Sequence, residues 1–327
     1  MRVVVIGGSG HVGTFLVPRL VEAGHEVVSI SRGQREPYQV HPAWQSVEQV
    51  TLDREAEEAE GTFGKRVLGL EPDAVVDMIC FTPESARQLV DALRGRISHF
   101  LHCGSRRAGA PARGGGGPGA GGAGVPQGRL VRRRRHRAVF VLLDEARRGG
   151  FPATVLHPGH IVGPGWAPVN PAGNFALTVF ERLARGEELA LPNLGMETVH
   201  HVHADDVAQA FVRALDSWGV AVGESFHVVS AAALTLRGYA EAVAGWFGEP
   251  ARLRFLPWEE WREGVSEEEA EGTWDHIAHS PNCSIAKAGR LLDYQPRYSS
   301  LQAVRESLGW LVEHGEVEAE WTSKSSR

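Results

Sequence analysis

Short apolar runs alternate with segments of helical periodicity along the first part of the chain. Residues 2–6 are a β-branched run that leads into glycines, residues 11–24 have helical spacing and close on a glycine, and residues 25–33 hold a second apolar run. This order predicts a strand, a helix and a second strand that form one βαβ unit.

The alternation continues to about residue 165. Residues 73–81 and 97–105 predict two more buried strands with a helix over 83–95 between them, and residues 152–165 predict a later strand that ends in a Gly/Pro-rich loop. Strands that alternate with helices predict a parallel sheet with helices on both faces. From residue 166 onward the pattern is mixed, which predicts a second, smaller domain.

Charge and cysteine content narrow the class of protein. The 327 residues carry a formal net charge of −6, so the chain as a whole does not attract nucleic acid or anionic lipid. Cys80, Cys103 and Cys283 are an odd number without a C-x-x-C pair, which favours reduced thiols in a cytoplasmic protein. No apolar run approaches the roughly 18 residues of a membrane span, and we expect no membrane partner.

The sequence GGSGHVG follows the first predicted strand directly. Gly7, Gly10 and Gly13 have the spacing G-x-x-G-x-x-G where a helix begins, and the missing β-carbons let the backbone and the helix N-terminus approach a pyrophosphate. His11 and Val12 belong to the same motif. Because the motif lies inside a βαβ unit, it predicts a dinucleotide site rather than a simple tight turn.

The end of the second predicted strand indicates which dinucleotide is bound. An acidic residue there would bind the ribose hydroxyls of NAD, but the chain has Ser31, Arg32 and Gly33. An arginine can pair with a 2′-phosphate, so NADP is favoured over NAD as the cofactor; the alternative is that Arg32 is a solvated turn residue. Asp53, in the run TLDR at the end of a further predicted strand that precedes residues 73–81, either accepts a hydrogen bond from the adenine amine or is a turn or cap residue.

Six motifs spread over nearly the whole chain carry a family resemblance. They are VIGGSGHVG, PDAVVDMI, HFLHCGS, TVLHPGHIVGPG, HHVHADDVAQAF and SIAKAGRLLDYQPRYSSLQAVRESLGWL. Together they resemble the extended short-chain dehydrogenases/reductases, the NAD-dependent epimerase/dehydratase group. The resemblance implies an α/β protein, with a Rossmann-type doubly wound parallel sheet over residues 1–165 and a smaller mixed C-terminal substrate domain over 166–327, some of whose elements return to the sheet. It also implies reversible hydride transfer on a sugar nucleotide or a related hydroxyl or carbonyl substrate.

The resemblance further implies a tyrosine as general base, a lysine four residues later and a Ser or Thr hydroxyl that polarises the substrate oxygen. Ser105 matches the hydroxyl position, whereas Leu130 and Arg134 occupy the region where the tyrosine and the lysine are expected. No Tyr-x-x-x-Lys pair exists anywhere in the chain. Leucine cannot exchange a proton, and arginine differs from lysine in pKa and shape. We therefore expect impaired catalysis; the alternative is a non-catalytic NAD(P)-binding sensor or regulatory protein.

Residues 102–141 form a Gly/Arg-rich segment that departs from the family pattern. Between Ser105 and Leu143 there is no acidic residue, no tyrosine and no lysine, and family-like sequence then resumes. Two compensating frame errors in a GC-rich gene would produce this composition; a genuine low-complexity loop and a functional basic arm are the alternatives. In each case we expect poor order over residues 106–128, because the segment buries too little apolar surface to offset its chain entropy.

The remaining candidates are less specific. The resemblance implies that Asn174 contacts substrate, with turn formation as the alternative, and that Pro158 belongs to the strand-to-loop turn beside the nicotinamide. His201 and His203 share one face of a predicted strand, but two ligands on one strand are weak evidence for zinc, so no metal site is predicted. The expected partner is a small-molecule substrate, and nucleic acid is not expected. Arginines over 129–137 would repel across a two-fold contact, which predicts a monomer or a weak homodimer.

Overall fold

The computed structural model describes the backbone of residues 1–104 and 127–320, and the side chains of all of these except 127–137. Most of the segment for which poor order is predicted therefore lies outside the described residues. The chain divides into two compact units. Unit 1 comprises Met1–Pro158, Ala208–His227 and Lys287–Tyr294, and unit 2 comprises Gly159–Val207, Val228–Ala286 and Gln295–Arg327.

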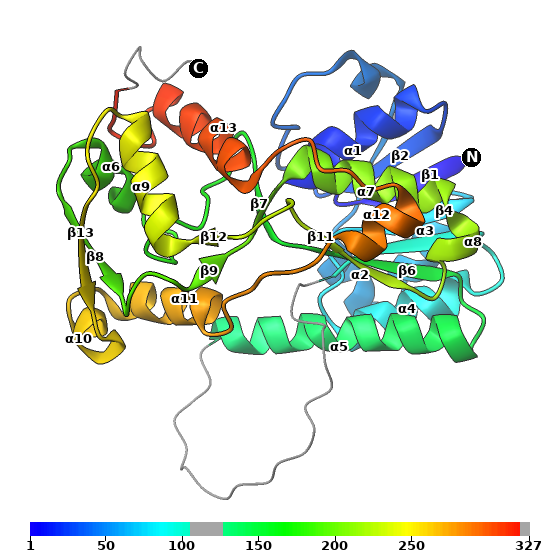
Figure 1. The fold of residues 1–327 in the computed structure, drawn as a ribbon. Helices are drawn as coiled ribbons and strands as arrows, with labels where there is room; N and C mark the ends of the chain where they lie inside the picture. The colour runs from blue at the N-terminus through cyan, green and yellow to red at the C-terminus, as the bar shows by residue number, and fades with distance from the viewer. Residues whose placement is uncertain (105–126, 321–327) are drawn as a thin grey trace, which may run out of the picture. The chain divides into compact units, whose positions relative to one another are not determined.

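A seven-stranded sheet forms the centre of unit 1 (Figure 1), in the strand order β11-β6-β5-β4-β1-β2-β3. These strands are β1 (Arg2–Ile6), β2 (Glu26–Ser31), β3 (Glu48–Thr51), β4 (Ala74–Asp77), β5 (His99–Cys103), β6 (Ala153–Pro158) and β11 (Ser225–Val228). Pairing from β3 to β6 is parallel. Because the order runs outward in both directions from the adjacent strands β1 and β4, the sheet is of the Rossmann type. The predicted fold class is confirmed.

Helices cover both faces of this sheet (Figure 1). The helical elements of unit 1 are α1 (His11–Glu22), η1 (Pro42–Ser46), α2 (Arg54–Ala59), α3 (Phe63–Leu68), α4 (Pro83–Leu93), α5 (Gln127–Arg148), most of α7 (Ala204–Asp216), α8 (Trp218–Ala221) and α12 (Ala286–Leu292). Val3 and Val4 point to opposite faces of β1 and both are fully buried, which is typical of a parallel strand covered on both sides. α4 packs against α3 and α5, and its Leu89 joins Val4 and Leu142 in one core cluster.

Local sequence signals account for where the helices begin and end. Thr82 caps α4 by accepting a hydrogen bond from the backbone N–H of Ser85 at 3.0 Å, and Pro83 occupies the first turn, where a missing N–H costs nothing. α1 ends just before Gly24, whose φ of +81° suits a residue without a β-carbon.

Unit 2 is a mixture of helices and small two-stranded sheets. Its elements are β7 (His160–Val162), α6 (Thr178–Ala184), β8 (Glu188–Pro192), β9 (Thr198–Val199), β10 (His201–His203), β12 (Leu234–Thr235), α9 (Leu236–Trp246), β13 (Arg252–Leu256), α10 (Trp258–Glu263), α11 (Glu267–Ile277) and α13 (Ser300–Glu313). The strands pair as β10 with β7, β12 with β9 and β13 with β8. Phe180, Tyr239 and Trp261 belong to its core.

Candidate functional site

The glycine loop joins β1 to α1 through close backbone contacts. Gly7 has a φ of +89°, a left-handed conformation that residues with a β-carbon rarely adopt. A β-carbon at Gly13 would overlap the carbonyl oxygen of Gly8, so glycine is needed there for α1 to lie against the loop. Gly10 is the N-cap of α1 and makes no side-chain cap. The first turn of α1 therefore has backbone N–H groups that no N-cap side chain satisfies, which favours an anion.

A cavity of about 400 Å³ lies at the carboxyl ends of β1, β2, β3 and β4. Its lining consists of the glycine loop, the ends of these strands and the first residues of α2 and α4: Ile6, Gly7, Ser9, Gly10, Ile30, Ser31, Arg32, Gln34, Arg35, Leu52, Asp53, Arg54, Glu55, Glu58, Ile79, Phe81, Thr82 and Ser85. Strand order reverses between β1 and β4, and ligands of open α/β sheets bind at such a switch point.

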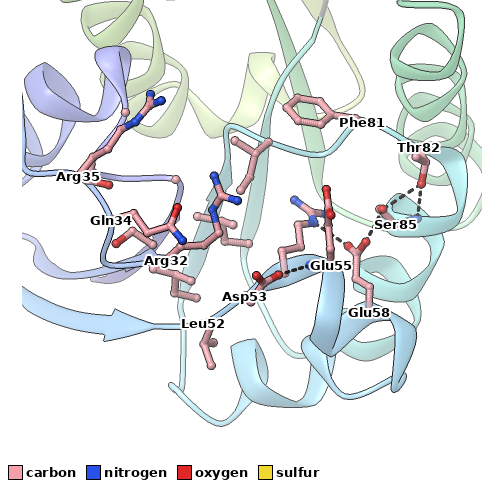
Figure 2. Close-up of a pocket in the computed structure, with 18 residues that line it drawn as sticks. Arg32, Gln34, Arg35, Leu52, Asp53, Glu55, Glu58, Phe81, Thr82 and Ser85 are labelled. Atoms are coloured by element: carbon pink, nitrogen blue, oxygen red, sulfur yellow. Dashed lines mark hydrogen bonds and ion pairs between the residues drawn. The ribbon is translucent and has the colours of Figure 1, made fainter. Parts of the chain in front are cut away.

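Two cations follow β2 at the rim of this cavity. Arg32 and Arg35 both line it, and Figure 2 shows Arg35 and Gln34 on the side away from Glu55, Glu58 and Ser85. Neither arginine forms an ion pair or a hydrogen bond with another described residue. Arg35 is a cavity residue that was not predicted from the sequence, although its place in the same loop after β2 was a usable signal.

Asp53 caps α2 and also lines the cavity. Its Oδ1 accepts hydrogen bonds from the backbone N–H groups of Glu55 at 2.9 Å and Ala56 at 3.2 Å. Within the described part of the chain Oδ2 accepts none. Asp53 is therefore the N-cap of α2, one of the two roles that the sequence suggests. Its second carboxylate oxygen remains for a ligand.

Arg54 lines the cavity and belongs to a buried ion-pair network that no sequence motif predicts. Its Nη1 donates to both carboxylate oxygens of Asp77, at 2.8 and 3.0 Å, and its Nε donates to Glu58 at 2.6 Å. Glu58 in turn accepts a hydrogen bond from Ser85 at 2.7 Å, as Figure 2 shows. Burial opposes the charge of Arg54, but Asp77 and Glu58 outweigh it and raise the pKa of the guanidinium. Nearby, burial raises the pKa of the Cys80 thiol, which keeps it protonated.

The remaining cofactor candidates are not among the residues that line the cavity. His11 stacks on Tyr38 with ring centroids 3.9 Å apart, and Val12 is buried in the core. Gly13 packs beneath the loop. Pro158 ends β6. The structure thus brings Gly7, Gly10, Ser31, Arg32 and Asp53 around one cavity.

The candidate catalytic positions are only partly described. Ser105 lies outside the described residues, directly after Gly104. Positions 130 and 134 lie on α5, but the side chains of Leu130 and Arg134 are outside the described part of the structure.

Asn174, in unit 2, is buried rather than open to a ligand. Its Nδ2 donates to Thr273 at 3.1 Å, and its Oδ1 accepts from Asn170 at 2.5 Å and from the backbone N–H of Ala176 at 3.1 Å. The side-chain amide thus stabilises its own loop, and substrate contact by Asn174 stays a prediction.

Comparison with known proteins identifies the family. The NAD dependent epimerase/dehydratase family matches residues 3–102 and 84–228. The chain belongs to this family. It is 24% identical over 314 residues, 94% of this chain and 78% of the other, to the chloroplast stem-loop binding protein of 41 kDa b from Arabidopsis thaliana. It is 34% identical to 2′-dehydrokanamycin reductase from Streptomyces kanamyceticus over 112 residues, 34% of this chain and 30% of the other.

Solved structures of epimerases share the fold. UDP-glucose 4-epimerase with UDP-glucose from Thermotoga maritima has a TM-score of 0.66 at 17% identity and covers 96% of this chain and 99% of its own. UDP-glucuronic acid 4-epimerase from Bacillus cereus, in complex with UDP-glucuronic acid and NAD, has a TM-score of 0.64 at 15% identity and covers 96% of this chain and 100% of its own.

The NAD-type cofactor of the epimerase/dehydratase family fits the residues of this cavity. The loop between β1 and α1 has glycines where β-carbons would clash, so a pyrophosphate has room there. Because α1 begins beside the cavity, its first backbone N–H groups can donate to the pyrophosphate. Among the described residues, His, Cys, Asp and Glu form no group of three or more suited to a metal ion. In the same residues, no helix is both long and apolar enough to span a bilayer.

Proposed function

We propose that this chain binds NADP in preference to NAD in the cavity beside the glycine loop. The observation that carries the proposal is the pair Arg32 and Arg35, two cations on the cavity lining that have no carboxylate partner among the described residues. A 2′-phosphate would pair with such cations. Ser31 stands where a carboxylate would repel that phosphate. Asp53 and Glu55 also line the cavity, but Figure 2 has Glu55 away from Arg35.

The reaction proposed is hydride transfer on a sugar nucleotide or a related hydroxyl or carbonyl compound. The nucleotide-sugar epimerases with the same fold support this substrate class. The bound cofactor supplies the hydride acceptor or donor. Proton transfer at the substrate oxygen falls to the protein, and no Tyr-x-x-x-Lys pair is present in the sequence to perform it. We therefore propose that turnover is impaired. The alternative is a sensor or regulatory protein that binds the dinucleotide without chemistry.

Calorimetric titration with NADP and NAD tests the cofactor proposal. Arg32→Ala should weaken NADP binding about 10- to 100-fold, the contribution of a hydrogen bond to a charged group, and should change NAD binding little. Arg87→Ala, an exposed arginine on α4 whose nearest carboxylate is 3.8 Å away, is the matched control. Tighter binding of NAD than of NADP, or unchanged NADP binding by Arg32→Ala, would refute the preference.

A further inference from the structure

The loop that follows β2 is exposed to solvent except at one place. Residues 32–36 and 39–40 are exposed, whereas Pro37 and Tyr38 between them are half-buried. An aromatic side chain that is partly buried has apolar surface in contact with another part of the protein. The loop that carries Arg32 and Arg35 is therefore attached to its surroundings at Tyr38.

Tyr38 contacts the first turn of α1. Its ring stacks on the imidazole of His11, with ring centroids 3.9 Å apart and an angle of 14° between the planes. Its backbone N–H donates to Oγ1 of Thr14 at 3.1 Å, and this hydroxyl donates to the carbonyl oxygen of Gly10 at 3.0 Å. These contacts connect the loop after β2 to the turn that follows the glycine loop.

The other end of the loop is held beside β2. Gly33 has a φ of +68°, and its backbone N–H donates to Oγ of Ser31 at 3.1 Å. The chain thus turns directly after the strand. Gln34 and Arg35, which both line the cavity, lie between this turn and Tyr38, so the backbone that carries them is held on both sides.

These attachments matter for a ligand that has charge at two places. In the proposed binding mode the pyrophosphate of NADP lies at the first turn of α1 and its 2′-phosphate at Arg32 and Arg35. The two groups belong to one molecule, so both bind at once only if the two protein segments have the right separation. A loop that is ordered before binding loses less conformational entropy when the ligand binds. The contacts of Tyr38 with α1 provide this order.

We propose that Tyr38 determines cofactor specificity: by stacking on His11 it holds the arginine loop where the 2′-phosphate of NADP binds. Tyr38 is a positioning residue, because it is not part of the cavity lining and acts through Arg32 and Arg35. The inference rests on the proposed function, since it requires NADP with its 2′-phosphate at these arginines. NAD lacks this phosphate, so its affinity does not depend on Tyr38.

The test removes the ring and keeps the backbone. Tyr38→Ala deletes the stack on His11 and leaves the backbone N–H that donates to Thr14. Tyr38→Phe is the matched control, because it keeps the ring, and the Tyr38 hydroxyl makes no hydrogen bond within the described part of the chain. Tyr38→Ala is also made in a background that carries Arg32→Ala and Arg35→Ala. Calorimetry measures the affinities for NADP and NAD, and the melting temperature shows that each variant is folded.

We expect Tyr38→Ala to weaken NADP binding about three- to tenfold, the size of an aromatic stacking contact. NAD binding should change by less than about twofold. Tyr38→Phe should bind both dinucleotides as the wild type does. In the background without the two arginines, Tyr38→Ala should weaken NADP binding no further, because the effect of Tyr38 passes through them.

Equal losses for NADP and NAD would overturn the proposal, since Tyr38 would then support the part that both dinucleotides share. Unchanged NADP affinity in Tyr38→Ala would overturn it as well, and so would a further loss in the background without the arginines. The same loss in Tyr38→Phe would assign the effect to the hydroxyl and refute the role of the stack. Wild-type protein that binds neither dinucleotide, or that prefers NAD, contradicts the proposed function instead, so the two failures are distinguishable.

Discussion

We expect the buried side chain of His99 to make the stability of the protein depend on pH. It begins β5, is 1% exposed, and its Nε2 lies 2.9 Å from the hydroxyl of Thr154. Burial lowers the pKa of His99 from 6.5 to about 4, because the charged form loses its hydration. We predict that His99→Gln, which keeps a polar partner for Thr154, makes the unfolding free energy less sensitive to acid than in the wild type.

The magnitude follows from the two pKa values. Above pH 6.5 His99 is neutral in both states and costs nothing. As the pH falls from 6.5 towards 4, the unfolded chain binds the proton and the folded protein does not, so stability decreases through this window and then levels off. The whole shift corresponds to about 3 kcal/mol, of which about 2 kcal/mol is lost by pH 5.

Urea unfolding at pH 7 and pH 5 measures this loss. Subtracting the result for His99→Gln from that for the wild type removes the contributions of the other histidines, and His279→Gln, at an exposed position, should behave as the wild type. If His99→Gln lost as much stability between pH 7 and pH 5 as the wild type does, the explanation by burial would be wrong. The explanation would also be refuted if the NMR signal of His99 titrated near pH 6.5 in the folded protein.

Four further predictions concern the site and the chain as a whole. Gly13→Ala should weaken NADP binding at least tenfold and lower the unfolding free energy by about 1–3 kcal/mol, because the new β-carbon would meet the carbonyl of Gly8. Calorimetry and urea unfolding measure the two effects. Gly245→Ala is the control, because nothing lies within 4 Å of a β-carbon there. Turnover of nicotinamide cofactor with sugar nucleotides should be at most a trace, since general acid/base catalysis contributes about 10²- to 10⁴-fold, and robust activity in a spectrophotometric assay would contradict the loss of the Tyr/Lys pair at Leu130 and Arg134. Sedimentation should find a monomer or a weak dimer, and a tight dimer at any salt concentration would refute this. Filter binding should find only weak nucleic-acid affinity that falls steeply as salt rises, and sequence-selective affinity at physiological salt would refute that.

The parts of the fold that the sequence predicts are those with a local signal. The βαβ unit, the glycine spacing and the cation after β2 all depend on residues close together in the chain, and the Rossmann-type sheet agrees with them. The sequence does not separate the two roles of Asp53, because a cap and a ligand contact use the same residue type. In the structure Asp53 caps α2 and also lines the cavity.

No local sequence signal predicts the ion pair of Arg54 with Asp77. The two residues are 23 positions apart, and they meet because β3 and β4 end at the same edge of the sheet on either side of β1 and β2. No periodicity or motif links them, so only the three-dimensional arrangement reveals the pairing. The same holds for Asn174, whose partner Thr273 comes from a helix 99 residues further along the chain.

Cofactor binding and proton transfer depend on different kinds of feature, which is why we propose that this chain keeps the first without the second. The cavity proposed for the dinucleotide is formed by backbone positions where a β-carbon would clash and by strand ends whose location the buried sheet fixes. Proton transfer in the family needs two particular side chains on one helix. That helix still packs into the core of unit 1 through Ala138, Val139 and Leu142, so its attachment to the sheet does not require a tyrosine or a lysine at positions 130 and 134. We therefore expect a change confined to those positions to remove proton transfer while the fold and the cofactor cavity remain.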